Sequence, residues 1–466
     1  MRKILLPLLV LGAVSMRVDA RTVSGSVFCG KEKLSGVIVT DGTNFTQTAR
    51  NGKFTFDIED DAAFVYIVTP SGYVADWSSG VPAFYQKADK DYYEFSLTAT
   101  QKTDTYNILA VGDPQPREEE HFEEFADIPL NDLASTASSL EGVTVGVALG
   151  DICYDRLHLQ KRWKEEIPRT GIPFYPAVGN HDHDMNSRDP QDEDCINAYR
   201  ENLGPENYAF CLAGDFVLVL DDIIYRKGKH YIEGYTEDVL DWVRGLMAYV
   251  PADADIYVAQ HSPLNGRNNR KMIVGHEVML DLLKGHDVSF LSGHNHINGN
   301  FEYAEGVREH NIAAICGTWW DAYHCTDGTP RGYKVFTKKD GHLSWYYKSI
   351  SRDRDFQFEV FKPGECRINS ESVVVNVWDY DPCWRVEWYE DGEYMGIMTQ
   401  VYEYSPLHAA ELEATYKPRG RKPSDYKRTR AAHHFFAERP SGKTRTFTVK
   451  VTDRFGNVFK ETISLK

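Results

Sequence analysis

Five short polar motifs between residues 106 and 300 contain the residue types that proteins use to hold metal ions. They are Gly112-Asp113-Pro114-Gln115, Gly150-Asp151-Ile152-Cys153-Tyr154-Asp155, Gly179-Asn180-His181-Asp182, Val258-Ala259-Gln260-His261 and Gly293-His294-Asn295-His296. Buried strands that end in carboxylates and imidazoles are energetically costly unless a cation neutralises them. Carboxylates and imidazoles around an open coordination position are ligands for divalent or trivalent metals. Each motif alone is weak evidence, but five in this order indicate a metal centre.

The surrounding residues predict an α/β domain that brings these motifs together. Three motifs follow clear apolar strands, in the stretches NILAVGD, TVGVALGD and VSFLSGH. The expected strands are 106–111, 143–149, 173–178, 216–220, 256–259 and 288–291, and the expected helices are 118–140, 156–167, 237–249 and 275–283. Alternating strands and helices predict a layered α/β fold, in which ligands gather at the carboxyl ends of the strands.

The motifs resemble those of the calcineurin-like metallophosphoesterase superfamily, whose pattern runs DxH, GDxx(Y/D), GNH(D/E), VxxH and GHxH. The resemblance covers residues 106 to about 300. It implies a four-layer α/β/β/α metallophosphoesterase domain with two divalent metal ions, expected to be Mn, Zn or Fe. It also implies hydrolysis of phosphate mono- or diesters by a hydroxide that bridges the two metals. The expected substrate is a small phosphate ester.

The resemblance implies a role for each motif residue. Asp151 would bridge both metals. The other ligands would be Asp113 and His296 on the first metal, Asn180, His261 and His294 on the second, and Gln115 at the place of the family's usual histidine. His181 would contact the phosphate and protonate the leaving oxygen, and Asp182 could orient it.

Two positions depart from the usual family pattern. Gln115 replaces a histidine, and some branches of the superfamily that act on nucleotide-type substrates share this DxQ sequence. Tyr154 stands where purple acid phosphatases carry a tyrosinate ligand to iron. It is either a ligand here or a tyrosine that packs in or beside the site, and metal identity stays open.

Residues after the last two motifs are candidates for substrate contact. Arg267 and Arg270 follow His261 on a polar loop, and arginine suits bidentate phosphate binding. Trp319, Trp320 and Arg331 follow the His-x-His motif, and exposed aromatic rings suit stacking on a base or sugar. Alternatively, the tryptophans pack the domain against the C-terminal part of the chain.

Composition divides the chain into four segments. Residues 1–20 read as a signal peptide with two early basic residues and an apolar run too short to span a bilayer. Residues 21–102 are expected to form a β-sandwich that resembles transthyretin-like or carboxypeptidase-regulatory-like modules. Residues 103–350 are the expected metallophosphoesterase domain, and 351–466 a C-terminal β-sandwich, so two small all-β domains would flank the centre. The protein should therefore be exported, to the periplasm, the medium or the cell surface, without stable membrane insertion.

Charge narrows the range of partners. Without residues 1–20 the net charge changes from −17 to −19, which disfavours broad nucleic-acid binding. The basic run 417–430 is expected to be a solvated loop, with a phosphate-facing patch as the alternative. Eight cysteines permit disulfides, and the oligomeric state is open. Two other functions are considered: a diphosphate hydrolase acting on nucleotide-linked substrates, motivated by Gln115, and a non-catalytic carbohydrate- or protein-binding surface module.

Overall fold

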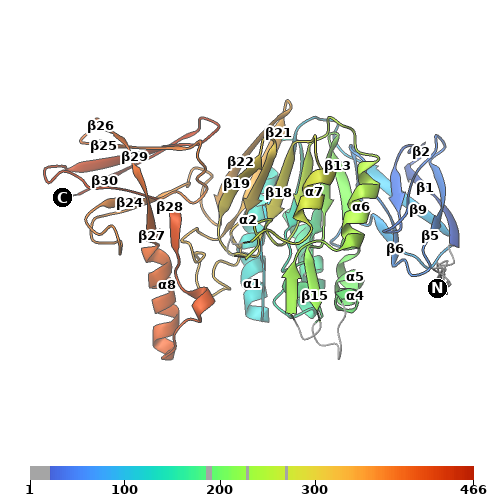
Figure 1. Ribbon diagram of the computed structural model, residues 1–466, viewed down its shortest axis with the longest axis horizontal. Helices are drawn as coiled ribbons and strands as arrows, with labels where there is room; N and C mark the ends of the chain where they lie inside the picture. Colours follow the sequence, from blue (N-terminus) through green and yellow to red (C-terminus); the bar gives the residue numbers. More distant parts are fainter. Residues whose placement is uncertain (1–20, 185–191, 227–229, 268–270, 466) are drawn as a thin grey trace, which may run out of the picture.

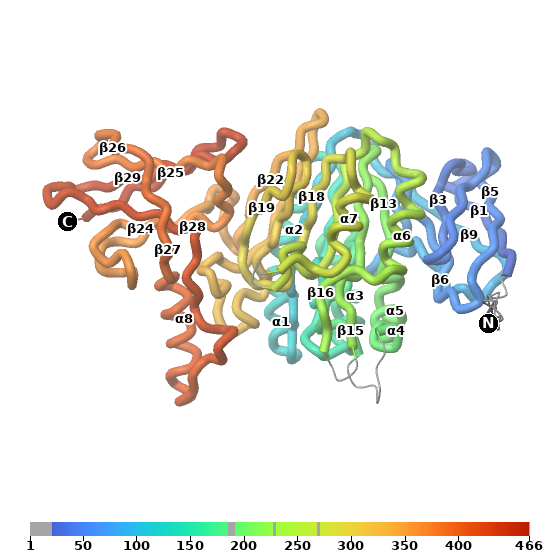
Figure 2. Tube along the Cα trace, in the orientation of Figure 1, coloured from blue at the N-terminus to red at the C-terminus, as the bar shows by residue number. Residues whose placement is uncertain are grey.

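The computed structural model describes residues 21–184, 192–226, 230–267 and 271–465. Three parts follow one another along the long axis: an N-terminal β-rich part, a central α/β part, and a C-terminal β-rich part (Figure 1). The trace in Figure 2 shows the same order from blue to red. The expected signal peptide lies outside the described residues. Within the described residues, no helix is both long enough and apolar enough to cross a membrane.

The N-terminal part consists of two small sheets that pack against the centre and contribute no site residue. One sheet has the order β2-β1-β9-β7 with β5 paired to β1, and the other has the order β4-β3-β6-β8. Their bounds are β1 Arg21–Cys29, β2 Glu32–Lys33, β3 Ile38–Thr40, β4 Phe45–Gln47, β5 Lys53–Ile58, β6 Phe64–Ile67, β7 Tyr73–Ala75, β8 Tyr85–Lys87 and β9 Tyr92–Ala99. The Phe84 ring packs in a tilted arrangement against Tyr208 of the central part, with centroids 4.7 Å apart, and this contact joins the two cores.

Two mixed sheets form the middle of the central part. The first has the order β12-β11-β10-β21-β22, and the second β13-β14-β17-β18-β20-β19. The first contains β10 Tyr106–Val111, β11 Val143–Ala148, β12 Phe174–Pro176, β21 Gly332–Lys339 and β22 His342–Ser349. The second contains β13 Tyr208–Leu212, β14 Asp215–Val219, β17 Ile256–Ala259, β18 Val288–Ser292, β19 Gly299–Ala304 and β20 Val307–Asn311. A short hairpin, β15 Ile223–Arg226 and β16 His230–Glu233, stands beside them.

The two sheets pack face to face, with helices outside them. His310 on β20 contacts Trp345 on β22 with ring centroids 4.6 Å apart, and Tyr106 donates a 3.0 Å hydrogen bond to Tyr257 across the same interface. Five helices follow strands of the first sheet in the chain: α1 Glu119–Asp127, α2 Pro129–Ser139, α3 His158–Glu166, α4 Asp192–Cys195 and α5 Asn197–Leu203. Helices α6 Glu237–Met247 and α7 His276–Leu282 follow strands of the second sheet. The four-layer α/β/β/α architecture is confirmed.

One expected helix is two helices. The run 118–140 breaks between Asp127 and Pro129, because Pro129 has no amide hydrogen to continue the α1 hydrogen-bond ladder. Proline is favoured at the first position of a helix, so α2 begins there. The strands 106–111 and 256–259 have the bounds that the sequence predicts.

The C-terminal part is rich in β-strands but is not all β. Its sheets have the orders β23-β24-β28-β27 and β26-β25-β29-β30. The bounds are β23 Glu359–Phe361, β24 Val373–Asn376, β25 Arg385–Glu390, β26 Glu393–Ile397, β27 Thr399–Tyr404, β28 Ala431–Glu438, β29 Thr446–Thr452 and β30 Val458–Ser464. Helix α8 Pro406–Tyr416 interrupts them and was not expected; Ser405 caps it by accepting a hydrogen bond from the amide of His408.

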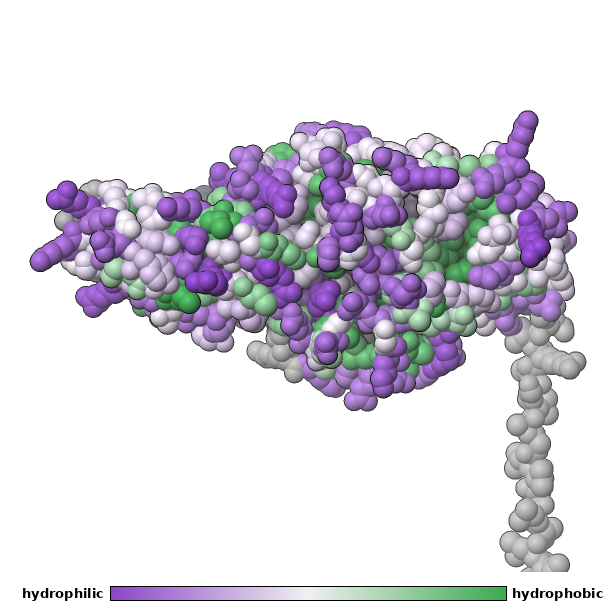
Figure 3. Space-filling model, turned by 90° about the horizontal axis from the view of Figure 1, so that it is seen from above, coloured by the Kyte–Doolittle hydropathy of each residue, from purple (hydrophilic) through white to green (hydrophobic). Residues whose placement is uncertain are grey.

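Buried polar contacts hold the C-terminal part on the centre. Lys334 Nζ lies 2.7 Å from Asp379 Oδ1, and both side chains are fully buried. Asn298 donates to the Trp378 carbonyl at 2.9 Å. The face shown in Figure 3 is mostly hydrophilic, with small interrupted apolar areas. All eight cysteines are free, so none of the disulfides that the sequence permits is formed in this structure.

Candidate metal centre

The polar motifs converge because the strands before them end at one edge of each sheet. Strands β10, β11 and β12 are parallel neighbours in the first sheet, and β17 and β18 are parallel neighbours in the second. Their carboxyl ends deliver five loops to the junction between the two sheets. Carboxylate, amide and imidazole groups that lie far apart in the sequence therefore meet in one buried cluster.

Asp151 lies at the centre of this cluster. Ligand atoms of Asp113, Asp151 and His261 all lie within 4.8 Å of one another. His261 Nε2 is 3.3 Å from Asp151 Oδ1, and the Gln115 amide nitrogen contacts the other Asp151 oxygen. His296 Nε2 is 3.4 Å from Asp113 Oδ1.

The remaining two expected ligands complete the cluster around His261. Asn180 Oδ1 lies 3.2 Å from His261 Nε2, and His294 Nδ1 lies 3.1 Å from the same nitrogen. All seven expected metal-binding residues are thus brought together. Among the described residues, Tyr154 forms no hydrogen bond with Asp113 or Asp151; it stacks on His181 instead, as expected for a tyrosine that packs beside the site.

Each of the three histidines is held from behind by an oxygen. His261 Nδ1 is 2.8 Å from the Leu149 carbonyl, and His296 Nδ1 is 3.1 Å from the Gly317 carbonyl. His294 Nε2 is 3.0 Å from Glu233 Oε1. Metal-binding histidines commonly donate their outer N–H to such an oxygen, which fixes the tautomer and aims the other nitrogen at the metal.

The donor set also contains polar atoms that need a partner. Asp113 Oδ1 and Gln115 Oε1 are buried and accept no hydrogen bond. Among the ion pairs of the described residues, none joins a lysine or arginine to Asp113 or Asp151. Buried carboxylate and amide oxygens without a hydrogen bond are costly, so the residues present fit a cationic group at this position.

The backbone is strained in the same place. Eight of the twelve described non-glycine residues with a positive φ lie in or beside the cluster: Asp113, Gln115, Asp151, Asp155, His294, His296, Trp319 and Trp320. A side chain on Gly179 would clash with the backbone nitrogen of Asp151, and one on Gly293 would lie 2.6 Å from Asp113 Oδ2. Strain of this kind persists only where the surrounding structure enforces it and is concentrated at functional sites.

Charges in the cluster shift the pKa values of its members. Burial alone would lower the pKa of His261, but Asp151 and Asp113 outweigh it and raise that pKa to about 10. Burial would also lower the pKa of His296, but Asp113 outweighs it and raises that pKa to about 10. Burial also opposes a low pKa for Asp151, whereas His261 and His181 hold it far below its ordinary value. The carboxylates thus favour positive charge at this position.

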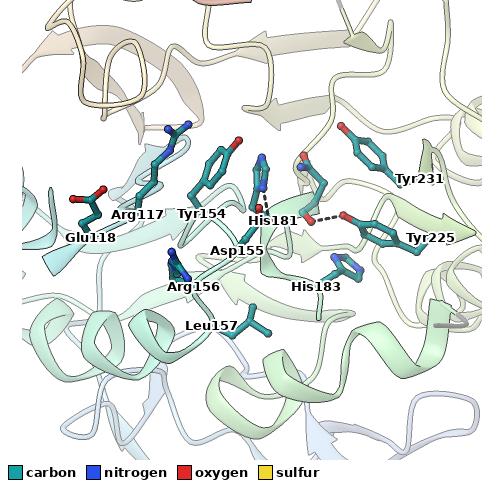
Figure 4. Close-up of a pocket in the computed structure, with 11 residues that line it drawn as sticks. Arg117, Glu118, Tyr154, Asp155, Arg156, Leu157, His181, His183, Tyr225 and Tyr231 are labelled. Atoms are coloured by element: carbon teal, nitrogen blue, oxygen red, sulfur yellow. Dashed lines mark hydrogen bonds and ion pairs between the residues drawn. The ribbon is translucent and has the colours of Figure 1, made fainter. Parts of the chain in front are cut away.

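A polar cavity of about 600 Å³ opens beside the cluster. It is lined by Arg117, Glu118, Tyr154, Asp155, Arg156, Leu157, Asn180, His181, His183, Tyr225 and Tyr231 (Figure 4). His181, the expected proton donor, lines this cavity next to Asn180. Burial would lower its pKa, but Asp151 and Asp155 raise it above the ordinary value. His181 is therefore placed as a group that can give a proton to a substrate, and the two carboxylates favour its protonated form.

The expected role of Asp182 is wrong. Its carboxylate accepts hydrogen bonds from the amides of Gly179 and Ile152, at 2.9 and 3.1 Å, and so ties the second motif to the third. The residue that holds His181 is Asp155, whose Oδ1 lies 2.7 Å from His181 Nδ1. Asp182 follows His181 in the same turn of 3₁₀ helix, and its side chain is directed into the interior instead.

The arginines that were expected to contact the substrate lie in different surroundings. Arg267 is exposed and lies by Glu233, at the edge of a neighbouring cavity that Tyr231 also lines. Arg270 lies outside the described residues. Arg331 is buried and forms a 2.7 Å ion pair with Glu124, so it does not line the cavity beside the cluster. This correction follows from its position before β21, where it faces α1.

The two tryptophans support the site and also meet the C-terminal part. Trp319 stacks on His296 with ring centroids 4.0 Å apart, and Tyr426 packs edge-on against Trp319 at 5.0 Å. Trp320 donates to the Pro114 carbonyl at 3.0 Å, which fixes the loop between Asp113 and Gln115. These contacts match the packing alternative, and stacking of a base or sugar on the two rings stays a prediction.

Three residues near the site were missed from the sequence. Glu233 lies on β16 and reaches His294 across 61 positions, so no local pattern signals it. Asp155 belongs to the second motif, but its partner His181 lies in the third. Arg117 follows the first motif by two residues and lines the cavity; a basic residue at that spacing was the available signal.

Three family models match the chain in succession. "N terminal of Calcineurin-like phosphoesterase" matches residues 21–100, "Calcineurin-like phosphoesterase" residues 106–298, and "C terminal of Calcineurin-like phosphoesterase" residues 309–459. A search of curated proteins finds no match.

Among solved structures, the chain is similar in part to a phosphatase and to nucleotidases. A dimetal phosphatase from Danio rerio is 15% identical, with 52% of this chain and 96% of that chain covered and a TM-score of 0.38. A 5'-nucleotidase from Candida albicans is 12% identical, with 54% and 52% covered and a TM-score of 0.34. A 5'-nucleotidase precursor from Thermus thermophilus is also 12% identical, with 52% and 54% covered and a TM-score of 0.32. The chain spans about half the length of the two nucleotidases.

Proposed function

Since this chain belongs to the calcineurin-like phosphoesterase family and is a hydrolase, we propose that it cleaves small phosphate mono- or diesters at a two-metal centre. The single observation that supports this most strongly is the arrangement of His261, His294 and His296. Each has an oxygen acceptor behind it and a second nitrogen directed at the carboxylates or at another imidazole. A metal-binding role accounts for all three orientations together.

The seven cluster residues divide between two metal positions. Asp113, Gln115 and His296 would hold one metal, Asn180, His261 and His294 the other, and Asp151 both. The donors are nitrogen and oxygen atoms without a thiolate, which suits Mn, Zn or Fe. When bound, the two cations supply Lewis-acid activation of water and neutralise the phosphate charge.

The chain itself supplies proton transfer and orientation. His181 lies beside Asn180 in the cavity and would give a proton to the leaving oxygen of the ester. Asp155 holds Nδ1 of His181, which leaves Nε2 to meet the substrate. Tyr154 covers one face of the imidazole at 4.0 Å and keeps its ring from rotating. No covalent phosphoenzyme is required, since the water attacks phosphorus directly.

The test is hydrolysis of p-nitrophenyl phosphate and bis-p-nitrophenyl phosphate by the protein without residues 1–20. Metal-stripped protein would be assayed alone and after addition of Mn, Zn, Mg, Ni or Fe, beside Asp151→Asn. We expect metal-dependent release of nitrophenolate that the variant lacks, and the better substrate decides between mono- and diester preference. Folded, metal-loaded protein without turnover on either compound or on nucleotide diphosphates would contradict the proposal and favour the binding module.

We also propose that the protein is exported. Arg2 and Lys3 precede an apolar run from Ile4 to Val14, and Val18-Asp19-Ala20 provides small residues for cleavage. N-terminal sequencing of the protein secreted by a bacterial host would begin at Arg21. Recovery of the chain only in the cytoplasm with Met1 intact would contradict export.

A further inference from the structure

Tyr154 lies between a guanidinium group and an imidazole. Arg117 Cζ is 4.0 Å from the centre of its ring, and the His181 ring is stacked on it at 4.0 Å with an interplanar angle of 24°. Two planar groups at this distance cannot share one face of a ring, so they occupy opposite faces. Figure 4 shows this order, with Tyr154 between Arg117 and His181.

The Arg117 guanidinium lacks a partner for two of its nitrogens. Nε and Nη2 are buried and make no hydrogen bond, although Arg117 lines the cavity. Leaving buried N–H groups unpaired is costly. A guanidinium presents its N–H groups in a planar fork that matches the oxygens of a phosphate or carboxylate. The geometry is therefore that of an anion-binding group without its anion.

The distance from the catalytic histidine decides which anion this is. Tyr154 separates Arg117 from His181 by two stacking intervals of 4.0 Å. A phosphate whose leaving oxygen meets His181 would have to pass around the edge of the tyrosine ring to reach the guanidinium as well, whereas a second anionic group of the substrate reaches Arg117 directly. Because His181 would protonate the leaving oxygen, we assign a group held on the opposite face of Tyr154 to the leaving portion of the ester.

The C-terminal part reaches the same place. Tyr426, in the 3₁₀ helix Asp425–Lys427, packs against Trp319, which itself stacks on His296. Burial would raise the pKa of Tyr426, but Ser424, Lys427 and Arg117 together lower it. The basic run 417–430 therefore meets the loop that carries Trp319, next to His296 of the cluster.

Tyr426 is fixed in this position by its neighbour. Lys427 is 4% exposed, and its ammonium group forms an ion pair with Asp321. Tyr416 at the end of α8 donates to the same carboxylate at 2.6 Å, and Thr415 donates to the Asp321 carbonyl at 2.8 Å. The segment is thus anchored to the loop that carries Trp319 and Trp320.

We propose that Arg117, with Tyr426 of the C-terminal part beside it, forms a subsite for a second anionic group on the leaving portion of the substrate. The substrate class is then a phosphate ester whose leaving group carries a phosphate or a carboxylate, as in a nucleoside diphosphate cleaved at its terminal phosphate. Water adds to the terminal phosphorus, and the bond between that phosphorus and the bridging oxygen breaks. The leaving phosphate takes the proton from His181, and the proton that the water loses restores His181 through solvent. This inference rests on the proposed function and extends it to the choice of substrate.

The test measures ligand binding by calorimetry on Mn-loaded protein with three compounds that are not hydrolysed. Methylphosphonate carries one anionic group, methylenediphosphonate carries two phosphonates, and phosphonoacetate carries a phosphonate and a carboxylate. We expect at least one of the two-group ligands to bind about tenfold more tightly than methylphosphonate. Arg117→Gln should remove that advantage while the affinity for methylphosphonate stays within about twofold, which also shows that the variant is folded.

Two further variants sharpen the result. Arg419→Gln removes an exposed positive charge from the same basic run and should leave the advantage intact, which excludes a general charge effect. Tyr426→Phe should reduce the advantage roughly threefold, because it removes the hydroxyl beside Arg117. If only the affinity for methylenediphosphonate depends on Arg117, the subsite binds a phosphate. If the affinity for phosphonoacetate also depends on Arg117, the subsite accepts a carboxylate as well.

An advantage that is absent in the wild type, or that survives in Arg117→Gln, overturns the subsite. An advantage unchanged in Tyr426→Phe overturns the part assigned to the C-terminal segment. Because the calorimetry does not depend on turnover, failure of nitrophenyl ester hydrolysis would contradict the proposed function separately.

Discussion

His181 Nδ1 lies 2.7 Å from Asp155 Oδ1, although the two residues belong to different loops of the metal centre. The contact fixes which nitrogen of the imidazole carries the proton that points away from the substrate. Tyr154 covers one face of the same ring. A residue that gives a proton in the transition state needs this kind of fixed orientation, because small displacements are costly in rate.

Replacing Asp155 with Asn should slow the reaction without removing the metals. The amide cannot hold the imidazole in its charged form as the carboxylate does, so we expect kcat to fall about tenfold to a hundredfold. His181→Ala should lower kcat by about 10² to 10⁴. Steady-state kinetics and metal analysis of both variants provide the measurement.

The double variant separates positioning from a direct catalytic role. If Asp155 acts only through His181, the variant with both changes should be no slower than His181→Ala alone. Equal metal content in all proteins is the control. Multiplied losses in the double variant, or loss of metal from Asp155→Asn, would show that Asp155 acts in another way.

Glu233→Gln should weaken metal binding. The carboxylate accepts the outer N–H of His294 at 3.0 Å and so increases the basicity of the nitrogen that would face the metal. We expect metal affinity to fall about tenfold to a hundredfold. Titration of metal-stripped protein with Mn, followed by recovery of activity, gives the apparent affinity.

A matched control is Glu305→Gln, which changes an exposed carboxylate in the turn between β19 and β20. It should bind metal as the wild type does. If Glu233→Gln binds metal normally but loses affinity for ester substrates, then Glu233 acts in substrate binding through Arg267, whose backbone amide donates a hydrogen bond to the Glu233 carboxylate.

The metal cluster was largely predictable because its signals are local. Each expected ligand directly follows a strand, and the turn after the strand is short, so sequence order alone places Asp113, Asp151 and His261 at one edge. The helix break at Pro129 was also readable, since proline ends a hydrogen-bond ladder, but the long amphipathic pattern obscured it.

The contacts that orient the ligands were not predictable, because they join residues distant in sequence. Glu233 meets His294 only after the β15–β16 hairpin folds beside the second sheet. Tyr426 meets Trp319 only once the C-terminal part docks. Asp182 was misread for a different reason: neighbours in a tight turn direct their side chains apart, so adjacency to His181 says little about contact.

Gly179→Ala should disturb the metal centre by steric conflict alone. Gly179 has an ordinary extended φ of −115°, but an added methyl group would meet the backbone nitrogen of Asp151. Overpacking of this kind costs about 1–3 kcal/mol. We expect a thermal midpoint lowered by roughly 2–4 °C for each kcal/mol, together with weaker metal binding.

Gly442→Ala is the control for this change, because its added methyl group would meet no atom within 4 Å. Its midpoint should match that of the wild type in differential scanning calorimetry. A Gly179→Ala protein with unchanged midpoint and metal affinity would show that the two loops can separate, and that their close contact is not needed to hold Asp151.

The ion pair between Lys334 and Asp379 should behave as a buried pair whose separation is costly. Both side chains are fully buried and 2.7 Å apart, and they join β21 to the C-terminal part. Lys334→Met leaves the Asp379 carboxylate buried without its partner, and such a loss costs about 3–5 kcal/mol. Lys334→Met with Asp379→Leu should be more stable than Lys334→Met, because an apolar pair carries no desolvation penalty.

Thermal unfolding of the wild type, both single variants and the double variant forms a complete cycle. Additive losses would mean that the two groups do not interact. If the two groups do interact, each single variant should also loosen the C-terminal part. The preference for two-anion ligands that Arg117 and Tyr426 confer should then weaken in each single variant and return in the double variant.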